Sequence, residues 1–538
     1  MLPFISPATG EQFGEVRMHT PQEVAQAVRE LREAAPLWRA KTPRERARIL
    51  LALLEVMLDS LDDITAVLNR DTGKSRQDAL IEVFMTADML RQYARHAPAW
   101  LRTRRVPRGL YLFKKTYVAY KPYGVVAVIA PWNYPFALAL PPVIAALLAG
   151  NAVALKPSEV TAASGVMIAE LFGKVPELAP FVRVLHGDGT VGAALVSAHP
   201  DYIFLTGSTP TGRAVMKAAG EQLIPVACEL GGKDAMLVLD DADLRAAAEW
   251  GVWGANFNAG QTCMAVERVY VEKPVYEEFV RLAVDEVNKL RVGYSPEKES
   301  PYYLGPVSDP RQVEVIRRHL DDALAKGAKI LVGGKIEGMY VEPTVLVDVN
   351  HDMLLMQEET FGPLMPIMPV EDEAEAIRMA NDCRFGLGAA VWSKDLRRAQ
   401  RVADQIEASS VVVNDTIAQF AVPMLPFGGL KDTGTGRIHG KEGLMQFVLP
   451  YAYAVGNPPY EWDIATILRR PGHYRLAAGL MRLLFGVSSR QRLEPVQEGL
   501  THLEERLPPL EQRRVPLAAG MLALAAAALT FALRRSKS

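Results

Sequence analysis

The run Gly124-Val125-Val126-Ala127-Val128-Ile129-Ala130 is apolar throughout and ends at a turn sequence that begins with Pro131. An apolar run without polar alternation is typical of a strand in a parallel sheet that is covered on both faces. Three similar runs follow, each ending in polar or glycine-containing turns before a helix-like segment: 151–155, 182–185 and 202–205. Strands that alternate with helices predict an α/β fold with a doubly wound, Rossmann-like sheet, whose ligands bind beyond the carboxyl ends of the strands.

The residues before this run predict elements that cover the sheet. Residues 4–18 hold turn signals between short apolar runs, which favours a strand or hairpin. Thr42-Pro43-Arg44-Glu45 is typical of a capped helix start, and we expect the helix to run to about Leu61. Another helix is expected over roughly 75–97.

Two further regions lie outside this sheet. From Met236 to Asn414, strand-like runs again alternate with helical segments, which predicts a second α/β domain. Residues 104–120 alternate and are rich in aromatic and basic residues, which predicts an exposed hairpin. An exposed edge with such apolar content needs a pairing partner.

Composition excludes several classes of function. The chain has 538 residues, 49% of them apolar, and a formal net charge of −2, so no global field favours a nucleic-acid partner. The first fifteen residues lack the pattern of a secretory signal. Only three cysteines occur, too few for a disulfide framework, which indicates a reduced compartment. The histidines do not cluster with cysteines at ligand spacing, so no metal site is expected.

The candidate chemistry centres on Cys263, in the stretch Phe257-Asn258-Ala259-Gly260-Gln261-Thr262-Cys263. A thiol in a glycine-containing turn is a candidate nucleophile, although a free cysteine is more commonly a buried packing residue. Glu229 lies 263 − 229 = 34 residues earlier, before a Gly-Gly turn. A carboxylate at that distance could face the thiol across a pocket.

Together with their neighbours, these stretches resemble the aldehyde dehydrogenase superfamily. Seven motifs carry the resemblance in order: Pro131-Trp132-Asn133-Tyr134-Pro135, Lys156-Pro157-Ser158-Glu159, Thr206-Gly207-Ser208-Thr209, Glu229-Leu230-Gly231-Gly232-Lys233, Gly260-Gln261-Thr262-Cys263, Glu358-Glu359-Thr360-Phe361-Gly362-Pro363 and Pro426-Phe427-Gly428-Gly429. The resemblance covers roughly residues 1 to 455. It implies an NAD-binding domain from residues 1–103 and 121–228, a catalytic domain over 229–445, and oligomerisation strands at 104–120 and 446–455.

The resemblance implies a catalytic role for three residues. Cys263 would attack the aldehyde carbon, and the side-chain amide of Asn133 would stabilise the resulting oxyanion together with the Cys263 N–H. Glu229 would activate the water that hydrolyses the thioester. Asn133 could also satisfy its own tight turn, and Lys233 is expected to be a structural salt-bridge partner.

The remaining motif residues imply a dinucleotide site. Lys156, Ser158 and Glu159 follow a strand end, where an acidic residue that accepts from the ribose 2′-hydroxyl favours NAD, although Lys156 could meet the phosphate of NADP. The resemblance places the pyrophosphate near Thr206, Gly207 and Ser208. It places Glu359 at the nicotinamide ribose and Phe361 near the ring, and it implies that Trp132 and Gly231 also bind the cofactor.

We therefore expect an enzyme that oxidises an aldehyde to a carboxylic acid with NAD or NADP through a cysteine thioester. Two alternatives stay open. A CoA-acylating relative would pass the acyl group to CoA, a route that needs no water-activating base such as Glu229. A non-catalytic homologue would not need Cys263, Glu229 and Asn133 together. A homodimer or homotetramer is expected through the predicted oligomerisation strands.

The C-terminal region differs from the rest of the chain. Residues 456–514 place arginines between apolar clusters, which favours a basic amphipathic tail at a membrane surface. Residues 515–533 carry no charge and as a helix would span roughly 28 Å, close to a hydrocarbon core, although eight of them are alanine. An alanine-rich helix packed on protein is the alternative. We expect a membrane anchor and a cytoplasmic catalytic domain. Some members of the resembled family that oxidise fatty aldehydes carry such a tail, so the resemblance implies a medium- or long-chain aldehyde.

Overall fold

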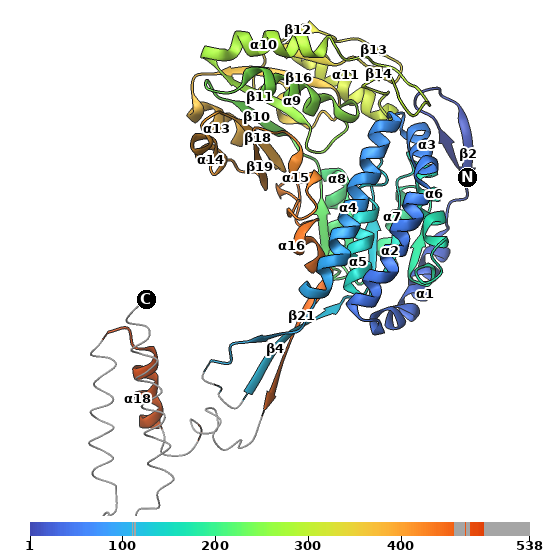
Figure 1. The fold of residues 1–538 in the computed structure, drawn as a ribbon, viewed down its shortest axis with the longest axis vertical. Helices are drawn as coiled ribbons and strands as arrows, with labels where there is room; N and C mark the ends of the chain where they lie inside the picture. Colours follow the sequence, from blue (N-terminus) through green and yellow to red (C-terminus); the bar gives the residue numbers. More distant parts are fainter. Residues whose placement is uncertain (110, 112–113, 457–468, 470–473, 489–538) are drawn as a thin grey trace, which may run out of the picture. The chain divides into compact units, whose positions relative to one another are not determined.

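The computed structural model describes residues 1–109, 111, 114–456, 469 and 474–488, and these form two compact units (Figure 1). The larger unit comprises Met1–Arg102 and Tyr120–Pro450. The smaller unit comprises Thr103–Ala119 and the described residues after Pro450. All candidate site residues belong to the larger unit.

The larger unit contains a five-stranded parallel sheet in the order β7-β6-β5-β8-β9. Its strands are β5 (Val125–Ile129), β6 (Ala152–Lys156), β7 (Val182–Val184), β8 (Tyr202–Thr206) and β9 (Val226–Glu229). The order reverses between β5 and β8, so a crevice is expected where these two strands end. The prediction of a doubly wound, Rossmann-like sheet is confirmed.

Helices cover both faces of this sheet: α1 (Pro21–Ala40), α2 (Pro43–Asp59), α3 (Leu61–Thr72), α4 (Arg76–Trp100), α5 (Leu140–Ala149), α6 (Ala162–Gly173), α7 (Gly189–Ser197) and α8 (Thr209–Gly220). Residues of β5 alternate between the two cores. Val126 and Val128 pack with α2, α4 and α5, whereas Val125 and Ala127 pack with α1 and α7. A strand buried on both faces explains the continuous apolar run in the sequence.

The helix expected to run to about Leu61 is α2, which ends at Asp59; the chain leaves helical geometry at Ser60, and α3, which was not predicted, follows. The capping box that starts α2 is present, with Thr42 and Glu45 exchanging hydrogen bonds. After the turn that begins with Pro131, α5 starts only at Leu140, because residues 134–139 form a turn whose N–H groups at Phe136 and Ala137 bond to the Glu82 carboxylate.

A second sheet has seven strands in the order β12-β15-β16-β11-β10-β18-β19. Its strands are β10 (Asp234–Val238), β11 (Val266–Glu272), β12 (Lys329–Val332), β15 (Thr344–Val347), β16 (Leu364–Val370), β18 (Gly388–Trp392) and β19 (Ser410–Val413). All neighbouring pairs are parallel except the β12–β15 edge. The helices packed on its faces are α9 (Leu244–Asn256), α10 (Lys273–Val287), α11 (Pro310–Ala325), α13 (Glu373–Asn381) and α14 (Leu396–Ala403).

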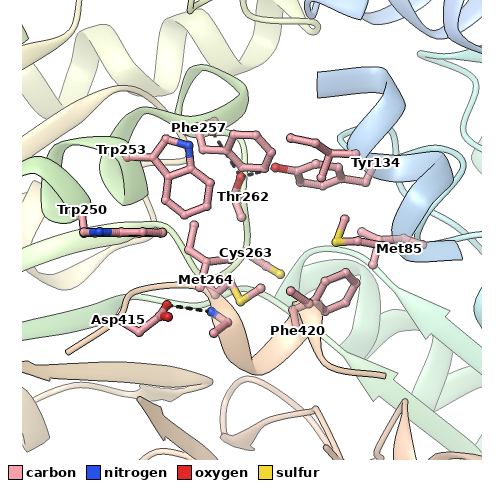
Figure 2. A pocket seen from close by; sticks show the side chains of 15 residues that line it. Met85, Tyr134, Trp250, Trp253, Phe257, Thr262, Cys263, Met264, Asp415 and Phe420 are labelled. Carbon is pink, nitrogen blue, oxygen red and sulfur yellow. Dashed lines mark hydrogen bonds between the residues drawn. The ribbon is translucent and has the colours of Figure 1, made fainter. Parts of the chain in front are cut away.

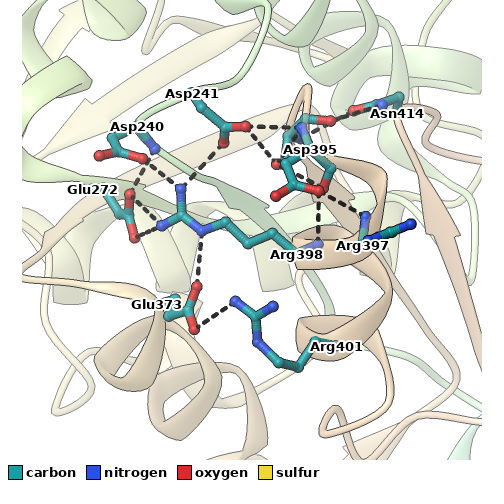
Figure 3. A network of polar contacts seen from close by, with 10 residues as sticks. Asp240, Asp241, Glu272, Glu373, Asp395, Arg397, Arg398, Arg401 and Asn414 are labelled. Atoms are coloured by element: carbon teal, nitrogen blue, oxygen red, sulfur yellow. Dashed lines mark hydrogen bonds and ion pairs between the residues drawn. The ribbon is translucent and has the colours of Figure 1, made fainter.

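One arginine ties several elements of this second sheet together (Figure 3). Arg398 on α14 makes ion pairs with Asp240 and Asp241 after β10, with Glu272 at the end of β11 and with Glu373 at the start of α13. Its side chain is 20% exposed, so these carboxylates replace most of its hydration. The network fixes α14 at the carboxyl ends of two central strands.

Short elements complete the larger unit. The predicted N-terminal hairpin is present as β1 (Leu2–Ile5) and β2 (Gln12–Val16). The other short pieces are η1 (Ala179–Phe181), η2 (Phe257–Gly260), β13 (Ile336–Glu337), β14 (Tyr340–Val341), α12 (Leu354–Gln357), β17 (Phe385–Gly386), α15 (Ala418–Ala421), β20 (Leu430–Lys431) and α16 (Gly440–Met445).

The smaller unit holds strands from both segments expected to pair. β21 (Val448–Gly456), β4 (Lys114–Pro122) and β3 (Arg104–Val106) form one sheet in that order. Tyr117 stacks on Tyr453, with ring centroids 5.0 Å apart, and several apolar side chains of β21 are exposed. The unit also contains α18 (Tyr474–Phe485).

The predicted transmembrane segment 515–533 lies outside the described residues, as does most of the predicted tail. Within the described part of the chain, no helix combines the length and the apolar character that crossing a bilayer requires.

Candidate active site

The Cys263 loop connects α9 to β11 through an unusual backbone. Asn258, Ala259 and Gly260 have φ values of 55°, 56° and 73°, in the left-handed region that non-glycine residues rarely adopt. A Cβ on Gly260 would overlap the carbonyl group of Gly362, so glycine is required there. Such a backbone persists only where surrounding contacts enforce it, and this is common in active sites.

Buried hydrogen bonds enforce this backbone. The Asn258 side chain donates to the backbone oxygen of Asn133 at 3.0 Å, and the Gln261 side chain donates to the Asn258 oxygen at 2.8 Å. Gln261 also accepts from the Ser308 N–H at 2.8 Å. The loop before Cys263 is therefore held from both sides.

Glu229 and Cys263 lie side by side although they belong to different sheets. Glu229 ends β9 of the five-stranded sheet, and Cys263 precedes β11 of the seven-stranded sheet. Glu229 is buried, and within the described residues neither of its carboxyl oxygens has a hydrogen-bond partner of normal geometry. Burial raises the pKa of Glu229 to about 8, and the adjacent Cys263 thiol partly offsets this shift.

The surroundings of Cys263 favour the neutral form of its thiol. Burial raises the pKa of Cys263 well above its usual value, and the carboxyl groups of Glu229, Asp234 and Glu359 raise it further. A neutral thiol needs a base before it can attack as a thiolate. The adjacent Glu229 also has a raised pKa, so burial favours the neutral form of both groups.

Asn133 reaches the same loop. Its side-chain amide donates to the Gln261 oxygen at 3.0 Å, two residues before Cys263, instead of closing its own turn. The next residue, Tyr134, hydrogen-bonds Thr262 at 2.7 Å. Segments 128 residues apart in sequence are thus joined directly, and Asn133 lies beside the Cys263 loop.

A buried ion pair supports Asn133. Lys74 pairs with Glu82, with side chains that are 1% and 0% exposed, and Lys74 donates to the Asn133 oxygen at 2.9 Å. The sequence analysis missed this pair. Its signal is Glu82 alone inside the apolar run Ala79–Met85, where a charge is costly unless it is paired.

A second buried ion pair organises the Glu359 loop. Lys233 pairs with Glu267 at 2.5 Å, which is the structural role expected for Lys233. Glu267 also accepts from the backbone N–H groups of Thr360 and Phe361 at 2.7 and 2.8 Å. Glu359, next in the chain, accepts from the Gly232 N–H at 2.9 Å, and a Cβ on Gly231 would overlap its carboxylate.

The candidate cofactor residues gather near the switch point of the five-stranded sheet. Lys156 ends β6 and pairs with Glu159 at 2.7 Å, while Ser158 bonds within its own turn. Thr206 ends β8, and Gly207 and Ser208 lead into the N-terminus of α8. Trp132, which follows β5, meets Phe361 edge to face at 5.4 Å.

These residues fit a dinucleotide. A Cβ on Gly207 would meet one atom within 4 Å, at 3.8 Å, so there is open space beside the α8 N-terminus. N–H groups at a helix start suit a pyrophosphate, and the Glu159 carboxylate suits a ribose hydroxyl. Within the described residues, no group of histidine, cysteine or acidic side chains could hold a metal ion.

Cys263 forms part of the wall of an apolar cavity of about 280 Å³ (Figure 2). Figure 2 shows aromatic and sulfur-containing side chains around the thiol. The cavity is lined by Ile81, Met85, Tyr134, Leu138, Trp250, Trp253, Phe257, Thr262, Cys263, Met264, Asp415, Ile417, Ala418, Phe420 and Ala421.

The aromatic part of this wall was not predicted. Trp250, Trp253 and Phe257 recur three and four residues apart, which places them on one face at the end of α9. That spacing directly before the Cys263 loop is the signal that could have identified them.

Comparison with known proteins gives a consistent match. Residues 1–450 match the aldehyde dehydrogenase family. The chain is 43% identical over 449 residues to 4,4'-diapolycopene aldehyde oxidase of a Methylomonas species, covering 83% of this chain and 84% of the relative. It is 35% identical over 486 residues to a putative succinate-semialdehyde dehydrogenase [NADP(+)] of Mycobacterium ulcerans, covering 86% and 93%.

Solved structures agree with this match. The aldehyde dehydrogenase PutA from Anabaena variabilis, itself described as putative, superposes with a TM-score of 0.81 at 33% identity, covering 86% of this chain and 99% of that one. A betaine aldehyde dehydrogenase mutant from Staphylococcus aureus in complex with NAD+ gives 0.81 at 30% identity, covering 86% and 95%.

Proposed function

The chain belongs to the aldehyde dehydrogenase family, and on that premise we propose that it oxidises medium- or long-chain apolar aldehydes to carboxylic acids with NAD or NADP. The observation that carries the proposal is Cys263 in the wall of an apolar cavity, with the buried Glu229 carboxyl beside it.

Cys263 attacks the aldehyde carbon and forms a thiohemiacetal. The Asn133 amide lies next to the Cys263 loop, so its free N–H and the Cys263 N–H stabilise the alkoxide. Removal of one such donor typically costs about 2.7–4 kcal/mol of barrier. The Lys74–Glu82 pair keeps the Asn133 turn in place for this task.

The bound dinucleotide supplies the hydride acceptor. Lys156, Ser158 and Glu159 would hold its adenosine end, and Thr206, Gly207 and Ser208 would hold its pyrophosphate at the start of α8. Glu359 would bind the nicotinamide ribose, while Trp132, Gly231 and Phe361 would shape the space around the cofactor. The Lys156–Glu159 pair offers both a carboxylate for NAD and an ammonium for the NADP phosphate, which supports use of either.

Glu229 then acts as the base for hydrolysis. The thioester of Cys263 needs a water that loses its proton, and Glu229 is a buried carboxyl with unused acceptor oxygens next to that sulfur. This role favours hydrolysis over transfer of the acyl group to CoA. Intact Cys263, Glu229 and Asn133 favour catalysis over a non-catalytic role.

The cavity supports an apolar substrate. Its wall is made mainly of aromatic and aliphatic side chains. Three of these lining side chains, those of Ile81, Trp250 and Trp253, are also exposed to solvent. Each methylene that leaves water contributes about 0.8 kcal/mol to binding. The relatives are named for different aldehydes, one as a 4,4'-diapolycopene aldehyde oxidase and another as a putative succinate-semialdehyde dehydrogenase, so the cavity wall carries this part of the proposal.

The experiment is a substrate series. NADH or NADPH absorbance is followed with unbranched aldehydes from propanal to decanal, with and without CoA. We expect kcat/KM to rise with chain length and to be independent of CoA. A strict need for CoA would favour the acylating alternative, and no oxidation of any aldehyde would contradict the proposal.

The smaller unit bears on how subunits assemble. The exposed apolar side chains of β21 support a homodimer or homotetramer that pairs through this sheet. Light scattering at micromolar concentration should show an oligomer, and a monomer would contradict this.

A membrane anchor is the last part of the proposal. Uncharged residues 515–533 support a membrane anchor. The need for NAD and for a reduced Cys263 thiol favours a cytoplasmic catalytic domain. The full chain should sediment with membranes and resist carbonate extraction, whereas a chain that stops after Gln512 should be soluble and active. A soluble full-length protein would contradict the anchor.

A further inference from the structure

One cavity residue does not fit a purely apolar wall. Asp415 follows β19 and is one of the residues that line the cavity (Figure 2). Among the described residues that line the cavity, it is the only acidic one, and none is lysine, arginine or histidine.

Asp415 also lacks a compensating cation. One carboxylate oxygen accepts from the N–H groups of Thr416 and Ala418 at 2.6 and 3.2 Å. No ion pair joins Asp415 to a basic side chain in the part of the chain that the structure describes. Its half-buried carboxylate is therefore stabilised by two peptide N–H groups and by solvent, and not by a basic side chain of the described residues.

We propose that Asp415 is a specificity-determining residue that makes the cavity reject aldehydes carrying an anionic group. The inference rests on the proposed function and narrows its substrate class to uncharged aldehydes. A carboxylate on the substrate chain would lose water in an apolar cavity, meet no cation, and be repelled by Asp415. A neutral chain of the same length meets none of these obstacles.

The alternative role of Asp415 is structural. Its carboxylate accepts from the Ala418 N–H, three residues ahead, and so holds the turn before α15, whose N-cap residue is Ile417. Asparagine and serine can accept the same hydrogen bonds without a charge. Asp415→Asn and Asp415→Ser therefore remove the charge while keeping the hydrogen bonds that hold the turn.

The test compares hexanal with 6-oxohexanoate, which has the same chain length and a terminal carboxylate. We expect the wild-type kcat/KM to be much higher for hexanal than for 6-oxohexanoate. In both variants the ratio of these two kcat/KM values should fall roughly tenfold, as removal of one nearby like charge predicts. Asp372→Asn is the matched control. Asp372 caps α13 in the same way, does not line the cavity, and its variant should keep the wild-type ratio.

The outcomes separate the two claims. If wild type oxidises both substrates equally, or if a folded Asp415 variant keeps the wild-type ratio, the role of Asp415 is refuted while the proposed function stands. If wild type oxidises neither hexanal nor longer aldehydes, the proposed function itself fails.

Discussion

The ammonium group of Lys74 donates to the backbone oxygen of Asn133 at 2.9 Å, from an ion pair with Glu82 that is almost completely buried. The same Glu82 accepts from the N–H groups of Phe136 and Ala137. The turn that carries the proposed oxyanion donor is therefore fixed by a charge pair on a different element.

Loss of one partner of this pair should be costly. Lys74→Met leaves the Glu82 carboxylate buried and unpaired, and we expect a loss of about 3–5 kcal/mol in the free energy of unfolding, measured by urea denaturation. Lys298→Met is the control, because Lys298 pairs with Asp62 at 2.7 Å on the surface and should unfold like wild type. Equal stability of the two variants would contradict a structural role for the buried pair.

Gly260 tests the backbone of the Cys263 loop. Gly260→Ala introduces a Cβ at φ 73° that overlaps Gly362, so the loop must shift, and a displacement near 1 Å typically lowers activity about 100-fold. Gly10→Ala is the matched control, with φ 72° and no atom within 4 Å of the added Cβ. Activity assays and melting curves of both variants give the comparison. A fully active Gly260→Ala would show that the loop geometry is not required.

The sequence identified most of the fold because its signals are local. The apolar run of β5 and the capping box of α2 depend on neighbouring residues, and the structure contains both. The start of α5 at Leu140 was not predictable in this way. The turn before α5 depends on Glu82, more than fifty residues earlier in the chain.

The same distinction applies to the candidate site. Cys263, Glu229 and Asn133 stand in recognisable motifs, and the structure brings them together. The Lys74–Glu82 pair and the charge of Asp415 in the cavity depend on contacts between distant segments, which no local pattern encodes. The spacing of Trp250, Trp253 and Phe257 could be read from the sequence, but only the structure showed that these side chains line the cavity.

The cavity wall predicts a chain-length effect. Trp253→Ala removes an apolar wall, and we expect kcat/KM for decanal to fall roughly tenfold relative to propanal, since hydrophobic pocket contacts are worth about 1–3 kcal/mol. Leu396→Ala, which removes an exposed apolar side chain that does not line the cavity, should leave the ratio unchanged. If Trp253→Ala leaves the ratio of kcat/KM for decanal to that for propanal unchanged, the substrate chain does not bind against this wall.

The raised pKa of Glu229 predicts a pH dependence. With a pKa of about 8, the carboxyl is mostly protonated below that pH and can accept a proton only above it. We expect kcat to rise between pH 6.5 and 9 with an apparent pKa near 8. Glu229→Gln should lose this titration, and a wild-type profile that is flat over this range would argue against Glu229 as the base.

The most direct test of the mechanism is a rapid-mixing measurement of NADH formation by Glu229→Gln with a saturating aldehyde. If Cys263 forms a thioester that Glu229 helps to hydrolyse, the variant should release about one NADH per active site in a burst and then turn over slowly. Cys263→Ala should give no burst. Steady turnover of Glu229→Gln at the wild-type rate, or activity in Cys263→Ala, would contradict the account.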